Sequence, residues 1–301
     1  IMDRTSVDWT GPMPAVTTPF QADGDIDEKS FQSNVERLLG SGATGVLVGG
    51  CTGEFWALSH EERKHLSHLA KEAVGSAGTL ILGTGAITVD ETVALTREAE
   101  EAGCDGALIL PPYFVRLTDD EIFAHYAAVS DAVGIPILLY NIPGNAVNAL
   151  SPSLAGRLAE LERVVAIKES SGDWNNYYAT YLEVHERLRV FCGPSSIFGV
   201  PAVEMGADGV IDCFPNMWAD ALDLFHAPAR GDQEKAGELQ ALGRRLTDLC
   251  TTGGRTLYPA TKAAMDMQGL PGGGPPRAPL LPLAGEPLEG LERGLAAHGL
   301  L

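Results

Sequence analysis

Eight short apolar runs recur along the chain, and stretches with helical periodicity separate them. The runs are continuous instead of alternating, which is typical of parallel strands buried on both faces. The pattern therefore predicts strand and helix in alternation. The predicted strands are Met13–Thr17, Val46–Gly49, Leu80–Gly83, Ala107–Leu110, Ile137–Tyr140, Val164–Lys168, Val190–Gly193 and Gly209–Asp212. Predicted helices include Glu28–Leu39, His60–Val74, Thr88–Ala102, Asp119–Val133, Ser153–Leu161 and Ile197–Met205.

Eight such units favour a closed barrel over an open doubly wound sheet, which more often has about five to seven strands and a nucleotide-binding first turn. The nearest candidate for such a turn, Gly83-Thr84-Gly85, lacks the third glycine. We expect an α/β fold, a (β/α)8 TIM barrel over residues 1–219. Residues 220–301 form a predicted C-terminal helical extension, packed on the barrel and without a core of its own, with a Gly- and Pro-rich connection at Leu270–Pro279.

Composition restricts the partners of this barrel. A net charge of −19 opposes binding to nucleic acid or an anionic membrane, because both require a basic face. A small anionic substrate remains possible, since backbone N–H groups and a buried lysine can hold a carboxylate. Five cysteines without close pairs or zinc spacing suit a reducing compartment, and no signal peptide or membrane span is visible. These features predict a cytoplasmic protein.

Lys168 ends the sixth predicted strand, so its amine is expected at the mouth of an apolar barrel, where such folds place their chemistry. Poor solvation there lowers the pKa of an amine. A neutral amine attacks a ketone and becomes an iminium, which accepts electrons from an adjacent breaking bond. A lone lysine at a strand end more often reaches out to solvent or pairs with a neighbour, here Glu169.

Two further positions give Lys168 a chemical context. Tyr140 ends the neighbouring fifth strand, where a phenol can transfer protons; its alternative role is an aromatic lid on the barrel. Thr52 lies in the Gly-rich turn Gly49–Glu54, whose successive N–H groups can hold a carboxylate, although any tight turn before a helix has this composition. Glu54 is expected to brace this turn from the first turn of the following helix.

Three motifs resemble the dihydrodipicolinate synthase and N-acetylneuraminate lyase family of class I aldolases. They are the Gly-x-Thr-Gly-Glu turn from Gly50 to Glu54, Tyr140-Asn141-x-Pro143, and Ile167-Lys168-Glu169, in the right order and spacing. The resemblance covers nearly the whole chain, from Thr18-Pro19-Phe20 to the Pro-rich segment before the last helix.

The resemblance implies that Lys168 forms a Schiff base with a 2-oxo acid and that Tyr140 transfers protons. Thr52, with the backbone of Cys51 and Thr52, would bind the 2-oxo acid carboxylate, and Ile211 matches a position whose carbonyl faces the bound keto acid. It also implies a homo-oligomer, dimer or tetramer, and no metal or organic cofactor beyond the covalent Schiff base. The remaining candidate substrate-binding residues are Gly50, Asn145, Gly193 and Ser195.

Some positions depart from the family pattern and affect the substrate. Asn145 stands where dihydrodipicolinate synthases carry an arginine that binds the second substrate's carboxylate, and Asn cannot supply that charge. Cys51 replaces a hydroxyl residue, and Phe114 replaces a tyrosine that completes the proton relay of those synthases. Ser195 and Ser196 stand where sialic acid lyases have acidic residues after the seventh strand.

The prediction is a Schiff-base-forming lyase or aldolase that acts on a pyruvate-type 2-oxo acid or a 2-keto-3-deoxy sugar acid, by retro-aldol cleavage or by dehydration. One alternative is the condensation of pyruvate with an aldehyde, as in dihydrodipicolinate synthase. A second is a barrel that binds a ligand without catalysis. His60, His65 and His68 lie on a predicted helix without a carboxylate to complete a metal set, so a solvated helix face is expected there.

Overall fold

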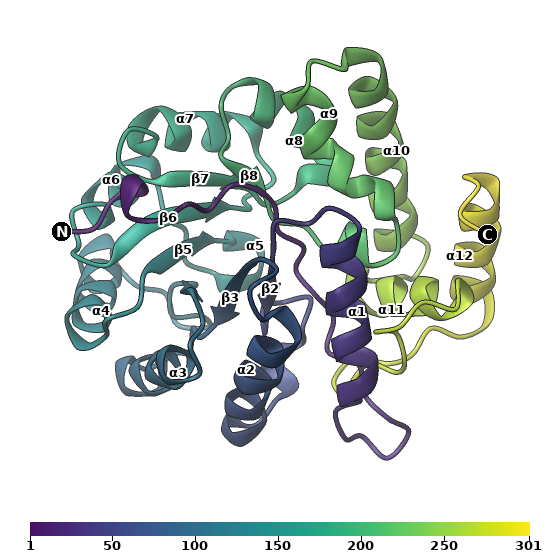
Figure 1. Ribbon diagram of the computed structural model, residues 1–301, viewed down its shortest axis with the longest axis horizontal. Coiled ribbons are helices and arrows are strands. Elements are labelled where there is room, and N and C mark those ends of the chain that lie inside the picture. The colour runs from purple at the N-terminus through teal and green to yellow at the C-terminus, as the bar shows by residue number, and fades with distance from the viewer.

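The computed structural model describes residues 1–301 and contains eight parallel strands surrounded by helices (Figure 1). The strand order is β1-β8-β7-β6-β5-β4-β3-β2, and a parallel bridge between Ala15 and Leu47 closes the barrel. The predicted (β/α)8 barrel is confirmed. The strands are β1 (Gly11–Pro12), β2 (Gly45–Val48), β3 (Thr79–Gly83), β4 (Gly106–Ile109), β5 (Ile137–Asn141), β6 (Val164–Glu169), β7 (Arg189–Cys192) and β8 (Gly209–Val210).

The first strand lies earlier in the chain than Met13–Thr17, and that prediction is wrong in its bounds. Backbone pairing nevertheless continues past β1, since the N–H of Ala15 donates to the carbonyl of Asp212 at 3.0 Å. Toward β2, the carbonyls of Pro12 and Pro14 accept hydrogen bonds, but their nitrogens carry no hydrogen to donate. The ladder on that side is therefore incomplete, which shortens the regular strand.

Most predicted helices form with bounds shifted by a few residues. Ser59, Thr88 and Thr118 each precede a helix, and their side chains accept from the backbone N–H three residues on, so they cap α2, α3 and α4. The helices are α1 (Glu28–Gly40), α2 (His60–Val74), α3 (Val89–Glu101), α4 (Asp119–Ala132), α5 (Pro143–Ala146), α6 (Pro152–Leu158), α7 (Trp174–Val184), α8 (Ser195–Glu204), α9 (Asp223–Ala229), α10 (Gln233–Thr251), α11 (Leu257–Met267) and α12 (Gly285–Ala297).

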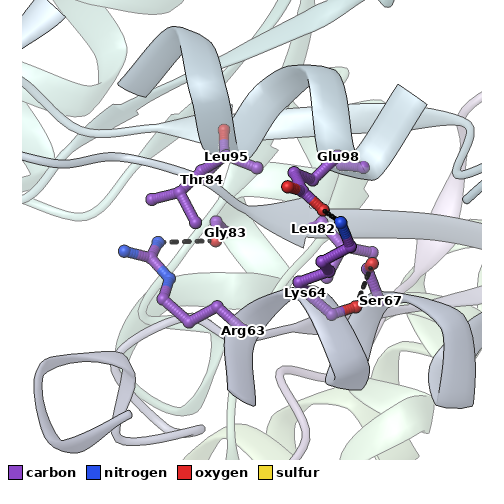
Figure 2. A pocket seen from close by; sticks show the side chains of 9 residues that line it. Arg63, Lys64, Ser67, Leu82, Gly83, Thr84, Leu95 and Glu98 are labelled. Carbon is purple, nitrogen blue, oxygen red and sulfur yellow. Dashed lines mark hydrogen bonds and ion pairs between the residues drawn. The ribbon is translucent and has the colours of Figure 1, made fainter. Parts of the chain in front are cut away.

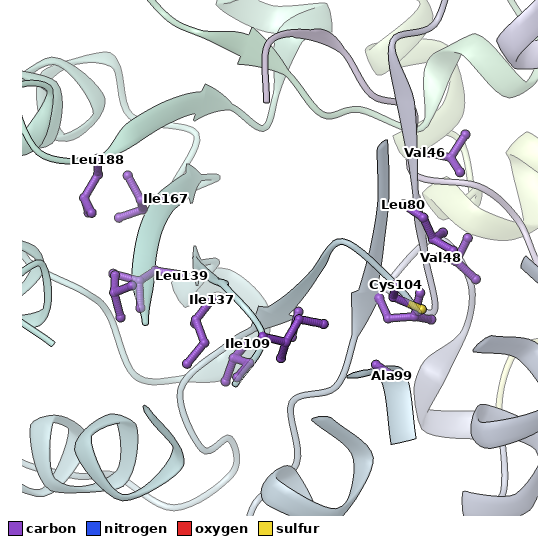
Figure 3. Close-up of a cluster of buried hydrophobic side chains, with 14 of the residues drawn as sticks. Val46, Val48, Leu80, Ala99, Cys104, Ile109, Ile137, Leu139, Ile167 and Leu188 are labelled. Atoms are coloured by element: carbon purple, nitrogen blue, oxygen red, sulfur yellow. The ribbon is translucent and has the colours of Figure 1, made fainter. Parts of the chain in front are cut away.

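Alternate residues of each strand supply two separate cores. The larger cluster, with 41 buried residues, lies between the strands and the surrounding helices; Figure 3 shows part of it, including Leu139 and Ile167. A second cluster of 16 residues fills the barrel interior and includes Cys51, Tyr140 and Ile211. These three follow or end strands, so the inner core carries them at the mouth of the barrel.

The C-terminal helices α9 to α12 lie together on one side of the barrel (Figure 1). A third cluster of 17 buried residues joins them to the barrel, with Phe214 and Trp218 from the segment after β8 and Leu246 and Met265 from α10 and α11. A division of the chain into residues 1–219 and 220–301 remains a proposal. None of the helices combines the length and apolar character needed to cross a membrane.

Candidate active site

Two cavities differ in their capacity for a substrate. The one between α2 and α3 has a volume of about 10 Å³ and is bordered by a hydrogen bond from Arg63 to Gly83 and by the ion pair of Lys64 and Glu98 (Figure 2). Such a space holds about one water molecule. The cavity at the barrel mouth measures about 250 Å³ and contains Lys168 in its lining, so it is the candidate active site.

Most of the predicted site residues meet at this cavity. Its wall comes from the ends of β5 and β6 and from the segments that follow β1, β2, β5, β6, β7 and β8, together with parts of α10 and α11. Gly50 and Ser195 are not part of the lining. The predicted residues that line it are Cys51, Thr52, Tyr140, Asn145, Lys168, Gly193 and Ile211.

Lys168 and Tyr140 are register partners on neighbouring strands β6 and β5, which places them side by side. The Nζ atom of Lys168 lies 4.2 Å from the centre of the Tyr140 ring. Only 5% of Lys168 and 4% of Tyr140 is exposed. Burial lowers the pKa of the Lys168 amine and raises that of the Tyr140 phenol well above its ordinary value. Both groups are thus held toward their neutral forms.

Glu169 does not pair with Lys168, so an ion pair with its neighbour does not explain why a lysine stands at this position. The two side chains point to opposite faces of β6 because they are consecutive in a strand. Glu169 instead accepts hydrogen bonds from the side chains of Asn141 at 2.8 Å and Asn176 at 3.0 Å and from the N–H of Ser171 at 3.1 Å. Lys168 forms no salt bridge with any carboxylate, so its amine is free to react.

Thr52 lies in a tight turn after β2 and is 6% exposed. Neither its N–H nor its hydroxyl has a hydrogen-bond partner within the protein, so both donors remain for a ligand. Glu54 braces the turn as expected, through a buried ion pair with Lys262 of α11 at 2.5 Å and by accepting the N–H of Arg277 at 2.9 Å. It precedes α2 in a left-handed conformation, instead of lying in the first turn of that helix.

The two predicted residues outside the lining have structural roles. Ser195 is buried at the start of α8, where its hydroxyl donates to the carboxylate of Asp212 at 3.0 Å. Gly50 lies beneath the mouth, against Leu47 of the inner core. Gly193 does line the cavity, and only glycine fits there because a Cβ atom would lie 1.7 Å from the Ser170 hydroxyl.

The lining contains two charged side chains, Lys168 and Asp212, and no arginine. Asn145 of α5 lies in the wall together with Tyr258 of α11. Arg116 is exposed on the loop before α4 and is not part of the wall. Apart from Lys168, the lining therefore offers neutral polar groups and one carboxylate, that of Asp212.

Sequence reasoning missed Tyr258, Asp212 and Thr247 as lining residues. Tyr258 and Thr247 come from α11 and α10, and no local pattern predicts that these helices cover the barrel mouth. Asp212 was recognisable, since it lies two residues after β8. Phe114, by contrast, is 88% exposed with a φ of 76° and does not reach the cavity of its own chain.

The histidines of α2 have no partners that would complete a metal set. His65 contacts Glu28 at 2.6 Å on the surface, and His60 lies 3.8 Å from Glu98. No three His, Cys, Asp or Glu side chains are arranged to hold a metal ion.

Comparison with known proteins identifies the family of this chain. The model of the dihydrodipicolinate synthetase family matches residues 8–298. The chain is 33% identical to 4-hydroxy-tetrahydrodipicolinate synthase of Syntrophobacter fumaroxidans, over 97% of this chain and 100% of the relative. It is 34% identical to the enzyme of that name from Methanothrix thermoacetophila, over 92% and 93% of the two chains.

Solved structures of the same family superimpose closely. YagE from Escherichia coli K12, solved in complex with pyruvate, has a TM-score of 0.92 and 26% identity, and the match covers 97% of this chain and 99% of that one. The chloride-inhibited dihydrodipicolinate synthase from Acinetobacter baumannii, complexed with pyruvate, has a TM-score of 0.90 and 30% identity with the same coverage. This chain belongs to the dihydrodipicolinate synthetase family and is an enzyme of its class, the Schiff-base-forming class I lyases.

Proposed function

We propose that this enzyme condenses pyruvate with an aldehyde through a Schiff base at Lys168. The single observation that carries the proposal is the amine of Lys168, which is buried at the barrel mouth, free of any carboxylate and 4.2 Å from the Tyr140 ring. Relatives named as synthases support condensation better than the cleavage or dehydration of a sugar acid that the sequence suggested. That first preference is therefore revised in favour of its alternative.

The proposed reaction uses the wall of the cavity as follows. The neutral amine of Lys168 adds to the ketone carbon of pyruvate, and loss of water gives an iminium. The free N–H and hydroxyl of Thr52 hold the carboxylate of pyruvate, since successive N–H groups of a turn suit an anion. A proton then leaves the methyl carbon, and the resulting enamine attacks the aldehyde carbon. The iminium serves as the electron sink, so the condensation requires no metal or organic cofactor.

Tyr140 is the proposed acid and base for these proton transfers because its phenol lies beside the amine that forms the iminium. Ile211 lies in the cavity wall just after β8, and its carbonyl would face the keto acid. The aldehyde would occupy the side of the cavity lined by Asn145, Ser196 and Thr247. Because these side chains are neutral donors, we propose an aldehyde with hydroxyl groups and without a second carboxylate.

The test is consumption of pyruvate in the presence of aldehydes, with aspartate semialdehyde and hydroxyaldehydes such as glyceraldehyde in the panel. The proposal predicts an aldol product with at least one of them, and no product for the Lys168→Met variant. A wild-type enzyme that releases pyruvate from 2-keto-3-deoxy sugar acids but forms no aldol product at high pyruvate would refute the preference for condensation. Binding of pyruvate without turnover of any substrate would support a non-catalytic barrel.

We also propose that the chain forms a homo-oligomer. Phe114 is 88% exposed and Val115 45%, and both follow β4 on the loop before α4. A large apolar side chain held in water with a left-handed backbone is unfavourable unless a partner covers it. Analytical ultracentrifugation should give a dimer or tetramer, and a monomer at micromolar concentration would contradict the proposal.

A further inference from the structure

A line of three polar side chains leads away from Lys168 through the wall of the cavity. The hydroxyl of Tyr140 donates to the sulfur of Cys51, with 3.8 Å between the two atoms. The thiol of Cys51 and the hydroxyl of Tyr258 line the same cavity wall, and burial together with the neighbouring Cys51 raises the pKa of the Tyr258 phenol well above its ordinary value. Either of these last two groups can act as a donor, because thiol and hydroxyl hydrogens rotate. The three residues come from β5, the turn after β2, and α11.

This line runs from the buried end of the cavity toward its mouth. Tyr140 and Cys51 are 4% and 6% exposed, whereas Tyr258 is only partly buried. The Tyr258 ring packs against Trp56 in a tilted arrangement, with 5.5 Å between the ring centres, and Asn145 lies beside it in the cavity wall. Tyr258 is thus the most exposed residue of the three.

Tyr140 requires such a line to act as a base. A neutral phenol has no capacity to accept a proton until it has given up its own, and a phenolate is strongly disfavoured where Tyr140 is buried. Phe114 has no hydroxyl and does not reach the cavity of its own chain, so it cannot take the proton. The neighbours that carry an exchangeable hydrogen and lead outward are Cys51 and Tyr258.

We propose that Tyr258 is the outer member of a proton relay within one chain, Tyr140 to Cys51 to Tyr258, that serves the reaction at Lys168. The proposal rests on the proposed function of this site. Asn145 would then have a role beyond substrate binding, because its amide lies in the same wall and would orient the Tyr258 hydroxyl toward Cys51. Tyr258 and Asn145 are positioning residues, since neither is placed against the reacting carbon.

The proton transfers balance as follows when the pyruvate iminium becomes an enamine. The methyl carbon gives its proton to the Tyr140 oxygen, and the electrons of that C–H bond form the new C=C bond. The electrons of the C=N double bond return to nitrogen, which becomes neutral. In concert, Tyr140 passes its own proton to the Cys51 sulfur, Cys51 passes its proton to the Tyr258 oxygen, and Tyr258 releases one to water. The net result is one proton moved from carbon to solvent.

Pyruvate alone is a sufficient probe, because enamine formation exchanges its methyl hydrogens for deuterium in D2O. Proton NMR gives the exchange rate, and borohydride trapping with mass spectrometry gives the fraction of Lys168 that carries pyruvate. We expect Tyr258→Phe to slow exchange roughly 10-fold or more, since acid–base groups contribute about 100- to 10,000-fold and water replaces part of the loss. The trapped fraction at saturating pyruvate should be unchanged.

A double-mutant cycle separates a relay from a packing effect. On the Cys51→Ala background the line is already broken, so Tyr258→Phe should slow deuterium exchange little further. Cys51→Ser keeps a group that both donates and accepts, and should retain exchange. Tyr178→Phe, which removes a hydroxyl from the exposed face of α7, is the matched control and should exchange like the wild type.

Two results would contradict the relay but not the proposed function, provided that the Lys168 adduct forms normally in each case. The first is unchanged exchange in Tyr258→Phe; the second is an equal loss for Tyr258→Phe on the wild-type and Cys51→Ala backgrounds, which would mean that Tyr258 acts only by packing. Absence of the adduct in the wild type would instead overturn the proposed function, and the relay with it.

Discussion

Asn145 provides the sharpest test of how the cavity selects its second substrate. The wall contains no arginine, and its one carboxylate, Asp212, repels a second negative charge. An aldehyde with a distant carboxylate therefore lacks a charge-assisted pair, which is worth roughly 2–5 kcal/mol in a desolvated site. This loss corresponds to roughly 30- to 4000-fold in kcat/KM. Asn145→Arg should restore part of it for aspartate semialdehyde and should not help an uncharged aldehyde.

The measured quantity is the ratio of kcat/KM for aspartate semialdehyde to kcat/KM for glyceraldehyde, both with saturating pyruvate. A ratio is needed because Asn145→Arg also removes an amide from the wall beside Tyr258 and should slow both reactions. Asn175→Arg, on the exposed side of α7, adds the same charge away from the cavity and should leave the ratio unchanged. If the wild type already prefers the semialdehyde, or if Asn145→Arg leaves the ratio unchanged, the electrostatic argument is wrong.

Three further predictions concern the amine of Lys168, the ion pair of Glu54 with Lys262, and the close contact of Gly193 with Ser170. Burial lowers the pKa of Lys168, so the rate of adduct formation should rise with pH through a midpoint below 10.5 and then level off. A midpoint at or above 10.5 would contradict the burial of the amine. Glu54→Gln leaves Lys262 buried without its partner and should cost about 3–5 kcal/mol in urea unfolding, whereas the double variant Glu54→Leu with Lys262→Met should recover most of this loss. Gly193→Ala forces a methyl group against Ser170 and should cost about 1–3 kcal/mol, and thermal melts should show partial recovery when Ser170→Gly is added.

The sequence predicted the parts of the site that follow from strand order. Lys168 and Tyr140 end consecutive apolar runs, and neighbouring parallel strands of a barrel necessarily bring such ends together. Ser195 lies outside the cavity lining because its hydroxyl donates to Asp212 from the segment after β8, a contact that sequence spacing does not show. Tyr258 was missed because the docking of α11 over the mouth depends on tertiary packing between distant segments.

The same distinction applies to the fold. Continuous apolar runs and amphipathic stretches indicated the number and order of the strands, because burial on both faces leaves a clear pattern. The bounds of the first strand could not be predicted in the same way. Pro12 and Pro14 allow an extended chain but interrupt its ladder, and only the pairing with β2 and β8 shows where regular structure ends.

The central claim is that Lys168 forms a covalent iminium with pyruvate. Incubation with pyruvate and borohydride, followed by peptide mass spectrometry, tests it directly, since reduction fixes the iminium on the amine that formed it. We expect one reduced pyruvyl group on the peptide that contains Lys168, and none in the Lys168→Met variant. A modification on Lys262 or a surface lysine, with Lys168 unmodified, would contradict it.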